Sequence, residues 1–145
     1  MFNRQTRFII ACLILTAMLF SGCTAYKSYE SESLKEITLS PEVDKKLKPV
    51  DATTVFNSDT KMIFCSFNPS KLPIGTKITA RWIYIKGEAK ELSNYIIEEW
   101  HEIIKKEGPL AMFIRRPANG WPKGSYGVVL FVDDREEISV PFTVK

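Results

Sequence analysis

Residues 125–144 read SYGVVLFV-DDRE-EISVPFTV, two apolar runs separated by four charged residues. Large apolar side chains occupy alternate positions from Tyr126 to Val132, and the same alternation continues from Ile138 to Val144. Successive side chains of a strand point to opposite faces, so each run presents one apolar face. The pattern predicts an antiparallel C-terminal β-hairpin that packs one face against a core.

Further short apolar runs precede this hairpin and are separated by turn residues. The runs MIFCSF (62–67), KITARWIYIK (77–86) and LAMFI (110–114) are rich in the β-branched and aromatic residues that favour strands. The turn-rich NPSKLPIGT lies between the first two runs, and Asn119-Gly120 follows the third. Strands at this spacing predict an all-β domain, either a sandwich or a barrel.

The segment LSNYIIEEWHEIIKKE (92–107) permits two interpretations. Its apolar residues between 96 and 104 recur at helical spacing, and Ser93 and Gly108-Pro109 could begin and end a helix at 93–107. Against this, Tyr95-Ile96-Ile97 is good strand material, and residues 105–108 could turn a hairpin into the next run. Periodicity favours the helix, whereas an all-β domain favours a strand, so the sequence leaves the choice open.

Cys65, Trp82 and Tyr126 fall in the predicted strands in the order typical of immunoglobulin-type sandwiches. Those domains place a cysteine on strand B against a tryptophan on strand C, with a tyrosine two residues before the second cysteine on strand F. Val128 stands at the position of that second cysteine, so packing replaces the disulfide and Cys65 is expected to be a buried, inert thiol. We therefore expect an Ig-like antiparallel β-sandwich of about seven strands.

The stretch GWPKGSYGV (120–128), with the closing VPFTV (140–144), resembles a pattern found in uncharacterised bacterial envelope lipoproteins and secreted Ig-like domains. That pattern is roughly W-P-x-G-x-Y-x-V followed by F-x-V. The resemblance covers residues 52–145, and it implies a β-sandwich in the cell envelope without any activity or ligand. Pro122 and Gly124 suit the corner entering the strand, where Tyr126 can bury its ring while its hydroxyl bonds to the backbone.

The first 22 residues have the organisation of a secretory signal peptide. Arg4 and Arg7 precede the apolar run FIIACLILTAMLF (8–20). At helical rise this run covers about 20 Å, which is less than the roughly 30 Å of a bilayer core. It ends in LFSGC (19–23), which resembles the lipobox of bacterial lipoproteins, so we expect cleavage before Cys23 and diacylation of its thiol. An ordinary signal peptide and an uncleaved anchor are the alternatives.

Residues 23–51 are predicted to form a lipidated N-terminus and a flexible tether, and residues 52–145 the folded domain. Polar and charged residues dominate the tether, and Pro41 and Pro49 interrupt any long helix. A flexible chain of this length has a root-mean-square reach of about 30 Å. Directly after Cys23 the chain has Thr24, whereas an Asp at this position resembles the inner-membrane retention signal of many Gram-negative lipoproteins. The absence of that Asp favours the outer membrane if the source has one.

The sequence offers little chemistry for catalysis. Cleavage would remove Arg4 and Arg7, leaving 18 of the 20 basic residues against 17 acidic ones, a balance that gives no footprint for nucleic acid. His101 is the only histidine, and no phosphate-binding, dinucleotide or Ca²⁺-loop motif occurs. We expect no metal, cofactor or small-molecule ligand. The alternative is a small envelope enzyme or enzyme subunit with a carboxylate site around Glu98, Glu99, His101 and Glu102.

The most informative feature is a set of apolar residues on the outward face of two predicted strands. If Trp82 and Tyr84 point inward, Arg81, Ile83 and Ile85 point outward. The candidate partner face comprises Arg81, Ile83, Ile85, Trp121, Val129 and Phe131. Either residues 92–107 or the tether cover this patch, or it docks an envelope protein or another copy. The predicted function is a membrane-tethered, non-enzymatic protein-binding or scaffolding module, and a purely structural lipoprotein is the remaining alternative.

Overall fold

The computed structural model describes residues 27–145, and the chain forms β-strands without any helix over that range. The expected signal peptide, Cys23 and the beginning of the expected tether lie outside the described residues. Within residues 27–145 there is consequently no helix that is long and apolar enough to cross a membrane.

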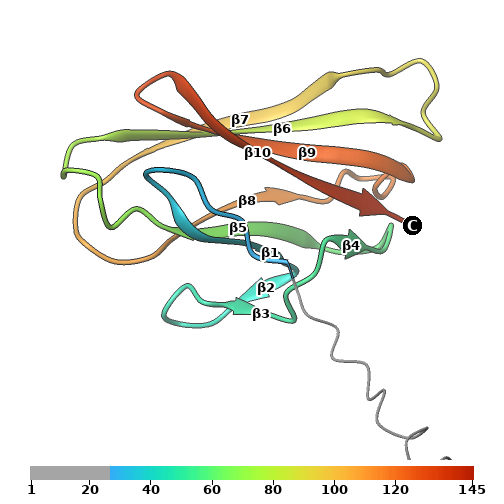
Figure 1. The fold of residues 1–145 in the computed structure, drawn as a ribbon. Helices are drawn as coiled ribbons and strands as arrows, with labels where there is room; N and C mark the ends of the chain where they lie inside the picture. The colour runs from blue at the N-terminus through green and yellow to red at the C-terminus, as the bar shows by residue number, and fades with distance from the viewer. Residues whose placement is uncertain (1–26) are drawn as a thin grey trace, which may run out of the picture.

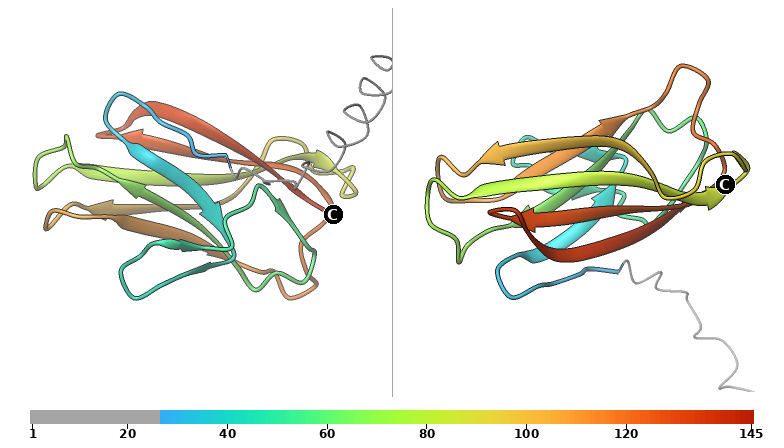
Figure 2. Two further views of the ribbon diagram at one scale, coloured as in Figure 1. Left: turned by 60° about the horizontal axis from the view of Figure 1, so that its bottom comes forward. Right: turned by 90° about the horizontal axis from the view of Figure 1, so that it is seen from above.

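Two sheets pack face to face with a small hairpin beneath them (Figure 1). The smaller sheet has the order β1 (Lys35–Ser40), β5 (Met62–Asn68), β8 (Leu110–Arg115). The larger sheet has the order β4 (Val55–Phe56), β10 (Arg135–Val144), β9 (Gly124–Val132), β6 (Lys77–Gly87), β7 (Tyr95–Ile103). Seen from above, β7, β6, β9 and β10 lie side by side in that order (Figure 2). The hairpin consists of β2 (Glu42–Val43) and β3 (Pro49–Val50).

The three marker residues confirm the predicted Ig-like sandwich. Cys65 lies on β5, Trp82 on β6 and Tyr126 on β9, and all three are buried in the core between the sheets. β5, β6 and β9 therefore take the places of strands B, C and F, with β1, β8 and β10 as A, E and G. Cys65 is a free thiol, as expected because Val128 stands where Ig domains have the second cysteine of the disulfide.

The C-terminal hairpin is confirmed with its predicted faces. β9 and β10 are antiparallel, with Val128 opposite Val140 and Tyr126 opposite Phe142, and all four side chains are buried. β10 begins at Arg135, so the connection is the two residues Asp133 and Asp134. Both have positive φ, 45° and 67°, which matches the twist of a tight hairpin turn.

A helix at residues 93–107 is ruled out, because this segment forms the edge strand β7. It pairs antiparallel with β6, with Lys77 opposite Ile103 and Tyr84 opposite Tyr95. The register shifts between Trp82 and Ile83, where Ile97 is the additional residue on β7. The apolar residues of β7 lie on both of its faces: Trp100 is opposite the core residue Ala80, whereas Ile96 is opposite the outward-facing Ile83. The strand therefore has no simple apolar alternation, and its spacing looked helical.

The expected boundary at residue 52 is also corrected, because most of the expected tether belongs to the sandwich. β1 pairs with β5, and Leu34, Ile37 and Leu39 are among the fully buried side chains. The β2–β3 hairpin lies beneath the smaller sheet (Figure 1). Three apolar residues suffice here because the neighbouring strands provide the rest of the core. Within residues 27–145 the first backbone pairing joins Tyr29 to Ile37, so the folded domain includes the chain from about residue 29.

Candidate functional site

The structure brings five of the six predicted face residues together on the outer surface of the larger sheet. Arg81 lies opposite Val129 in the β6–β9 pairing, and Ile83 lies opposite Gly127. The Arg81 guanidinium lies over the Phe131 ring, 4.6 Å from its centroid, and its Nε donates to Glu99 at 2.6 Å. The predicted orientation of β6 is therefore confirmed, with Arg81 as the centre of the patch.

These five residues cover one another to a large extent. Val129 is buried, and Ile83, Ile85 and Phe131 are half-buried. The Cδ1 atom of Ile85 lies 3.7 Å from the position that a Cβ on Gly127 would take, so Ile85 extends across this glycine. Residues 95–103 lie beside the patch as the strand β7, paired with β6, and do not cover it as a helix. None of these five side chains is fully exposed.

Trp121 does not belong to this face. Its side chain is 2% exposed, packs edge-on against Tyr126 and donates from Nε1 to the Thr60 carbonyl at 2.7 Å. Tyr126 in turn donates to the Pro122 carbonyl, as predicted for the corner before β9. Trp121 therefore fixes the loop that enters β9, and its place on the partner face was wrong because burial there was not evident from the chain alone.

Titratable groups of the core are structural. Burial raises the pKa of the Cys65 thiol to about 12, so the thiolate is absent at neutral pH. Burial, followed by the neighbouring Tyr84 and Glu88, raises the pKa of the Tyr126 hydroxyl. Both groups stay protonated at neutral pH and pack in the core, so they have a structural role and are not reactive groups.

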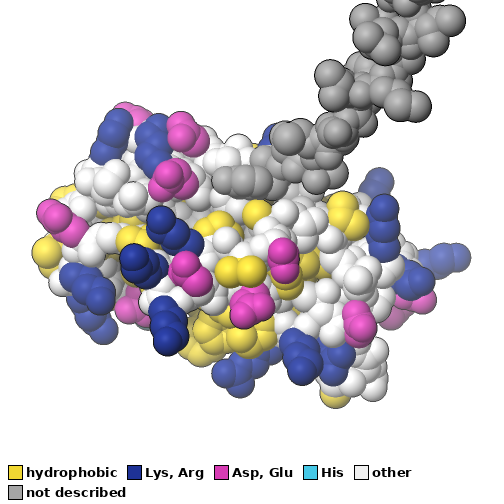
Figure 3. Space-filling view, turned by 90° about the horizontal axis from the view of Figure 1, so that it is seen from below, with side chains coloured by type: hydrophobic (Ala, Val, Ile, Leu, Met, Phe, Trp, Pro, Cys, Tyr) yellow, Lys and Arg dark blue, Asp and Glu magenta, His cyan; other side chains and the backbone are white. Residues whose placement is uncertain are grey.

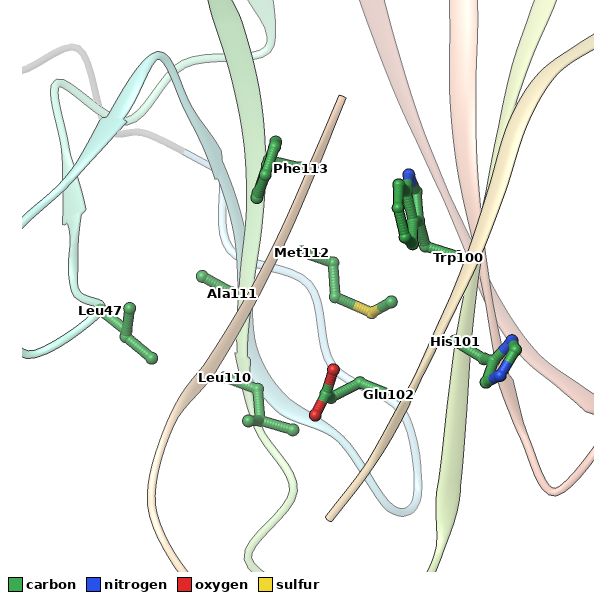
Figure 4. Close-up of a pocket in the computed structure, with 8 residues that line it drawn as sticks. All are labelled: Leu47, Trp100, His101, Glu102, Leu110, Ala111, Met112 and Phe113. Atoms are coloured by element: carbon green, nitrogen blue, oxygen red, sulfur yellow. The ribbon is translucent and has the colours of Figure 1, made fainter. Parts of the chain in front are cut away.

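The four residues of the alternative catalytic site do not converge. Glu98, His101 and Glu102 all lie on β7, but neighbouring residues of a strand point to opposite faces. Glu99 is held by Arg81, and Figure 4 shows His101 directed away from Glu102. Across residues 27–145 no group of three or more His, Cys, Asp or Glu side chains could hold a metal ion.

Exposed apolar side chains gather instead at the open edge of the sandwich. Trp100 on β7 is 54% exposed, and Phe113 on β8 and Leu47 in the β2–β3 turn are both 37% exposed. Trp100 is paired with Ala80 of the core, so it lies on the core-facing side of β7. The smaller sheet is too narrow to cover it, because β8 is its last strand. This cluster was not predictable from the sequence, since a tryptophan in a strand is ordinarily buried.

A groove of about 310 Å³ joins these residues. Ala111 and Phe113 lie on one side of β8, toward Leu47, whereas Met112 and Leu110 lie on the other, toward Trp100 and Glu102 (Figure 4). The opposite edge of β8 is paired with β5. A cavity bordered by side chains from both faces of β8 therefore runs along its free edge.

Aromatic and charged neighbours hold the outer wall of the groove. Phe113 packs against Phe64 with ring centroids 5.5 Å apart, and the Arg115 guanidinium lies 5.6 Å from the Phe113 ring. A space-filling view from below shows hydrophobic side chains gathered near one margin of the molecule, with charged side chains around them (Figure 3). The groove combines an apolar lining with a polar rim, which is the composition of a protein-binding surface.

A second cavity, of about 470 Å³, lies between the β2–β3 hairpin and the smaller sheet. Its lining is about equally polar and apolar, and its polar side chains include Thr38, Lys48 and Ser66. The Ser66 hydroxyl is buried and has no hydrogen-bond partner among the described residues. An ordered water would satisfy such a hydroxyl, so this cavity by itself indicates no particular ligand.

Comparison with known proteins supports the fold alone. No family model and no curated protein matches the chain. Among solved structures, an immunoglobulin-like protein from Pseudomonas aeruginosa aligns over 81% of this chain and 98% of its own, with 14% identity and a TM-score of 0.52. An alkylpurine DNA glycosylase from Pseudomonas fluorescens (13% identity, TM-score 0.44) aligns over 78% of this chain and 30% of its own. A β-glucosidase from Listeria innocua (8% identity, TM-score 0.42) aligns over 82% and 17%. The first match supports an Ig-like sandwich, and the other two carry no argument.

Proposed function

We propose that this chain is a membrane-tethered, non-enzymatic binding module of the bacterial cell envelope that captures a protein partner at the open edge of its sandwich. The observation that carries the proposal is the groove beside β8, where Trp100, Phe113 and Leu47 are exposed around one apolar cavity. Large aromatic side chains that line a concave surface are the usual anchors of protein interfaces. The outer face around Arg81 and Phe131 is less exposed and forms a secondary candidate surface.

The exposed apolar side chains of the edge strand β7 increase the risk of aggregation, which is easier to explain if the surface binds a partner. β7 has nine residues and exposes Tyr95, Ile96, Trp100 and Ile103. Unpaired edges with apolar side chains favour aggregation, and folded proteins usually protect them with charges, prolines or covering loops. β7 carries three glutamates of this protective kind, yet its apolar side chains are still exposed between them. A purely structural lipoprotein would gain nothing from leaving this surface open, whereas a binding module needs it.

The membrane anchor of the proposal depends on LFSGC at residues 19–23. Because Tyr29 already pairs with Ile37, residues 23–28 alone separate the proposed lipid from the sandwich. Fully extended, they span at most about 20 Å. With two acyl chains on Cys23 the domain would be held stably against the bilayer surface rather than at the end of a long tether.

Site-specific photocrosslinking in the native envelope tests the binding function. A photoreactive amino acid at position 100 or 113 should capture the same protein, identified by mass spectrometry. The same probe at Ile74, which is 65% exposed outside the groove, is the matched control. A third probe at Phe131 tests the outer face. Equal capture from Ile74 and Trp100, or none from either groove position, would rule out the groove as the binding site.

The anchor is tested separately. Mass spectrometry of the purified chain should find a diacylated N-terminal Cys23, and Cys23→Ser should release the folded domain from the membrane fraction. An unmodified Cys23 or an intact leader would contradict the lipoprotein assignment and leave the groove proposal unaffected.

A further inference from the structure

Among residues 27–145 the smaller sheet has no strand that covers the inner side of β7. In constant-type Ig domains the sheet that contains strands A, B and E has a fourth strand, D, beside E. Here the segment after β6 instead pairs with β6 as β7, and the order β1–β5–β8 ends at β8. The larger sheet therefore extends beyond the smaller one, and Trp100 lies on the part that extends.

The groove occupies the position of this absent strand. It follows the free edge of β8, with Leu47 and Phe113 on its outer side and Trp100 on its inner side. Packed sheets lie about 10 Å apart, so a strand beside β8 would pass directly beneath Trp100. Strand addition to an open edge is an established mode of peptide binding, in which backbone hydrogen bonds supply affinity and alternate side chains supply specificity.

The lining of the groove defines the side chains that such a strand must carry. Residues that point inward would meet Met112 and Trp100, and residues that point outward would meet Phe113 and Leu47. Glu102 also lies on the inner side, near Leu110, and pairs with Lys105 at 3.8 Å. Apart from Glu102 both sets are apolar, so the incoming strand is apolar on both faces over most of the length of β8, which is six residues or about 20 Å. An ordinary amphipathic strand would bury a polar face there.

Charge specifies one end of the strand. Arg115 and Arg116 lie at the C-terminal end of β8, and neither pairs with a carboxylate of the described residues. The Arg116 guanidinium donates only to the Asp59 carbonyl. An antiparallel incoming strand places its N-terminal end beside these arginines, where an acidic residue would pair with them. The β8 strand of a second copy would bring no acidic residue, since its sequence is LAMFIR.

We infer that the partner contributes an extended segment, apolar on both faces and acidic at its N-terminal end, which adds to β8 antiparallel as the fourth strand of the smaller sheet. This inference rests on the proposed function and specifies how the groove is used. The segment covers Trp100 and pairs with the free backbone of β8 at the same time.

The test uses the full chain and the synthetic peptide acetyl-Asp-Val-Ile-Val-Leu-Val with a soluble Gly-Ser tail. Of the three tryptophans, Trp82 and Trp121 are buried and Trp100 is exposed, so a fluorescence shift on titration reports Trp100. Hydrogen exchange of residues 110–115 should slow when the peptide binds, because strand addition protects the edge amides. Methylation of alternate peptide nitrogens should weaken binding by at least about tenfold, since it removes the donors to β8.

Charge exchange fixes the direction of the strand. Arg115→Glu should weaken the Asp peptide by about fivefold, and a Lys peptide should restore binding to that variant. Ile74→Ala is the matched control and should leave binding unchanged. Strand addition would be overturned by tight binding of the methylated peptide, by unchanged hydrogen exchange in β8, or by no binding of any peptide. Capture of a partner from position 100 would in that case still support the proposed function. A chain that self-associates through this edge, measured by analytical ultracentrifugation, would also overturn it.

Discussion

Tyr126 shows how much of the corner before β9 depends on a single side chain. Its ring packs between Tyr84, Trp121 and Phe142, and its hydroxyl donates to the Pro122 carbonyl. The sequence predicted this arrangement because the spacing Pro122, Gly124, Tyr126 is local. The burial of Trp121 was not predictable in the same way, since its partner Thr60 lies on another part of the chain.

Tyr126→Phe should lower the free energy of unfolding by about 1–1.5 kcal/mol, because the ring still packs but the buried hydrogen bond is lost. Urea denaturation followed by tryptophan fluorescence measures the change. Tyr95→Phe is the control, since Tyr95 is exposed, and it should have almost no effect. Equal stability of Tyr126→Phe and the wild-type chain would show that the corner bond contributes nothing.

Glu137 holds the beginning of the domain against β10 and makes its stability depend on pH. Its carboxylate accepts hydrogen bonds from the Ser33 amide at 3.0 Å and the Ser31 hydroxyl at 3.2 Å. Burial alone would raise the pKa of Glu137, but these hydrogen bonds and the charge of Arg135 lower it below the ordinary value of 4.5. A lowered pKa means that the stabilisation is present above pH 4.5 and is lost as the pH falls through the folded-state pKa.

We expect Glu137→Gln to be less stable than the wild-type chain at neutral pH and to lose less stability on acidification to about pH 3. Urea unfolding at a series of pH values measures both quantities. Part of the acid dependence should persist in the variant, because hydrogen bonds from Lys48 and Lys46 also lower the pKa of Asp44. Identical pH profiles for the two chains would contradict the role of Glu137.

At the scale of the elements, β6 and β9 depend on a close backbone contact at one end of their pairing. Gly87 lies opposite Gly124, and both have positive φ, near 154° and 153°. A Cβ on Gly124 would lie 2.3 Å from the Lys86 carbonyl oxygen. The glycine of the motif G-x-Y at position 124 is thus required for close approach to β6 as well as for the corner before β9.

Gly124→Ala should destabilise the domain by about 1–3 kcal/mol, because the methyl group forces the two backbones apart. Gly127→Ala on the same strand is the matched control: its Cβ would have no contact closer than 3.7 Å and needs no positive φ. Thermal unfolding of the two variants distinguishes them. Similar melting temperatures would show that the β6–β9 contact can relax.

At the scale of the whole molecule, the position where the domain begins is open to a direct test. A chain that starts at residue 27 should fold cooperatively, whereas one that starts at residue 52 lacks β1 and should not. Loss of a buried Leu or Ile side chain typically costs about 2–5 kcal/mol, so removal of Leu34, Ile37 and Leu39 costs about as much as the whole stability of a typical domain. The backbone pairing of β1 with β5 is lost in addition. Circular dichroism and amide NMR spectra of the two chains measure the outcome. A folded chain from residue 52 would restore the boundary expected from composition.

The sequence by itself determined the β-hairpin at residues 125–144, the strands that carry Cys65, Trp82 and Tyr126, and the faces that they bury. These features follow from alternation and turn residues, which are local properties of the chain. Only the tertiary structure decided that residues 95–103 form a strand, that residues 35–40 belong to the sandwich, and that Trp100 stays exposed. Those outcomes depend on which edge each segment meets: β6 offers β7 a partner, β5 offers β1 one, and no strand beside β8 covers Trp100.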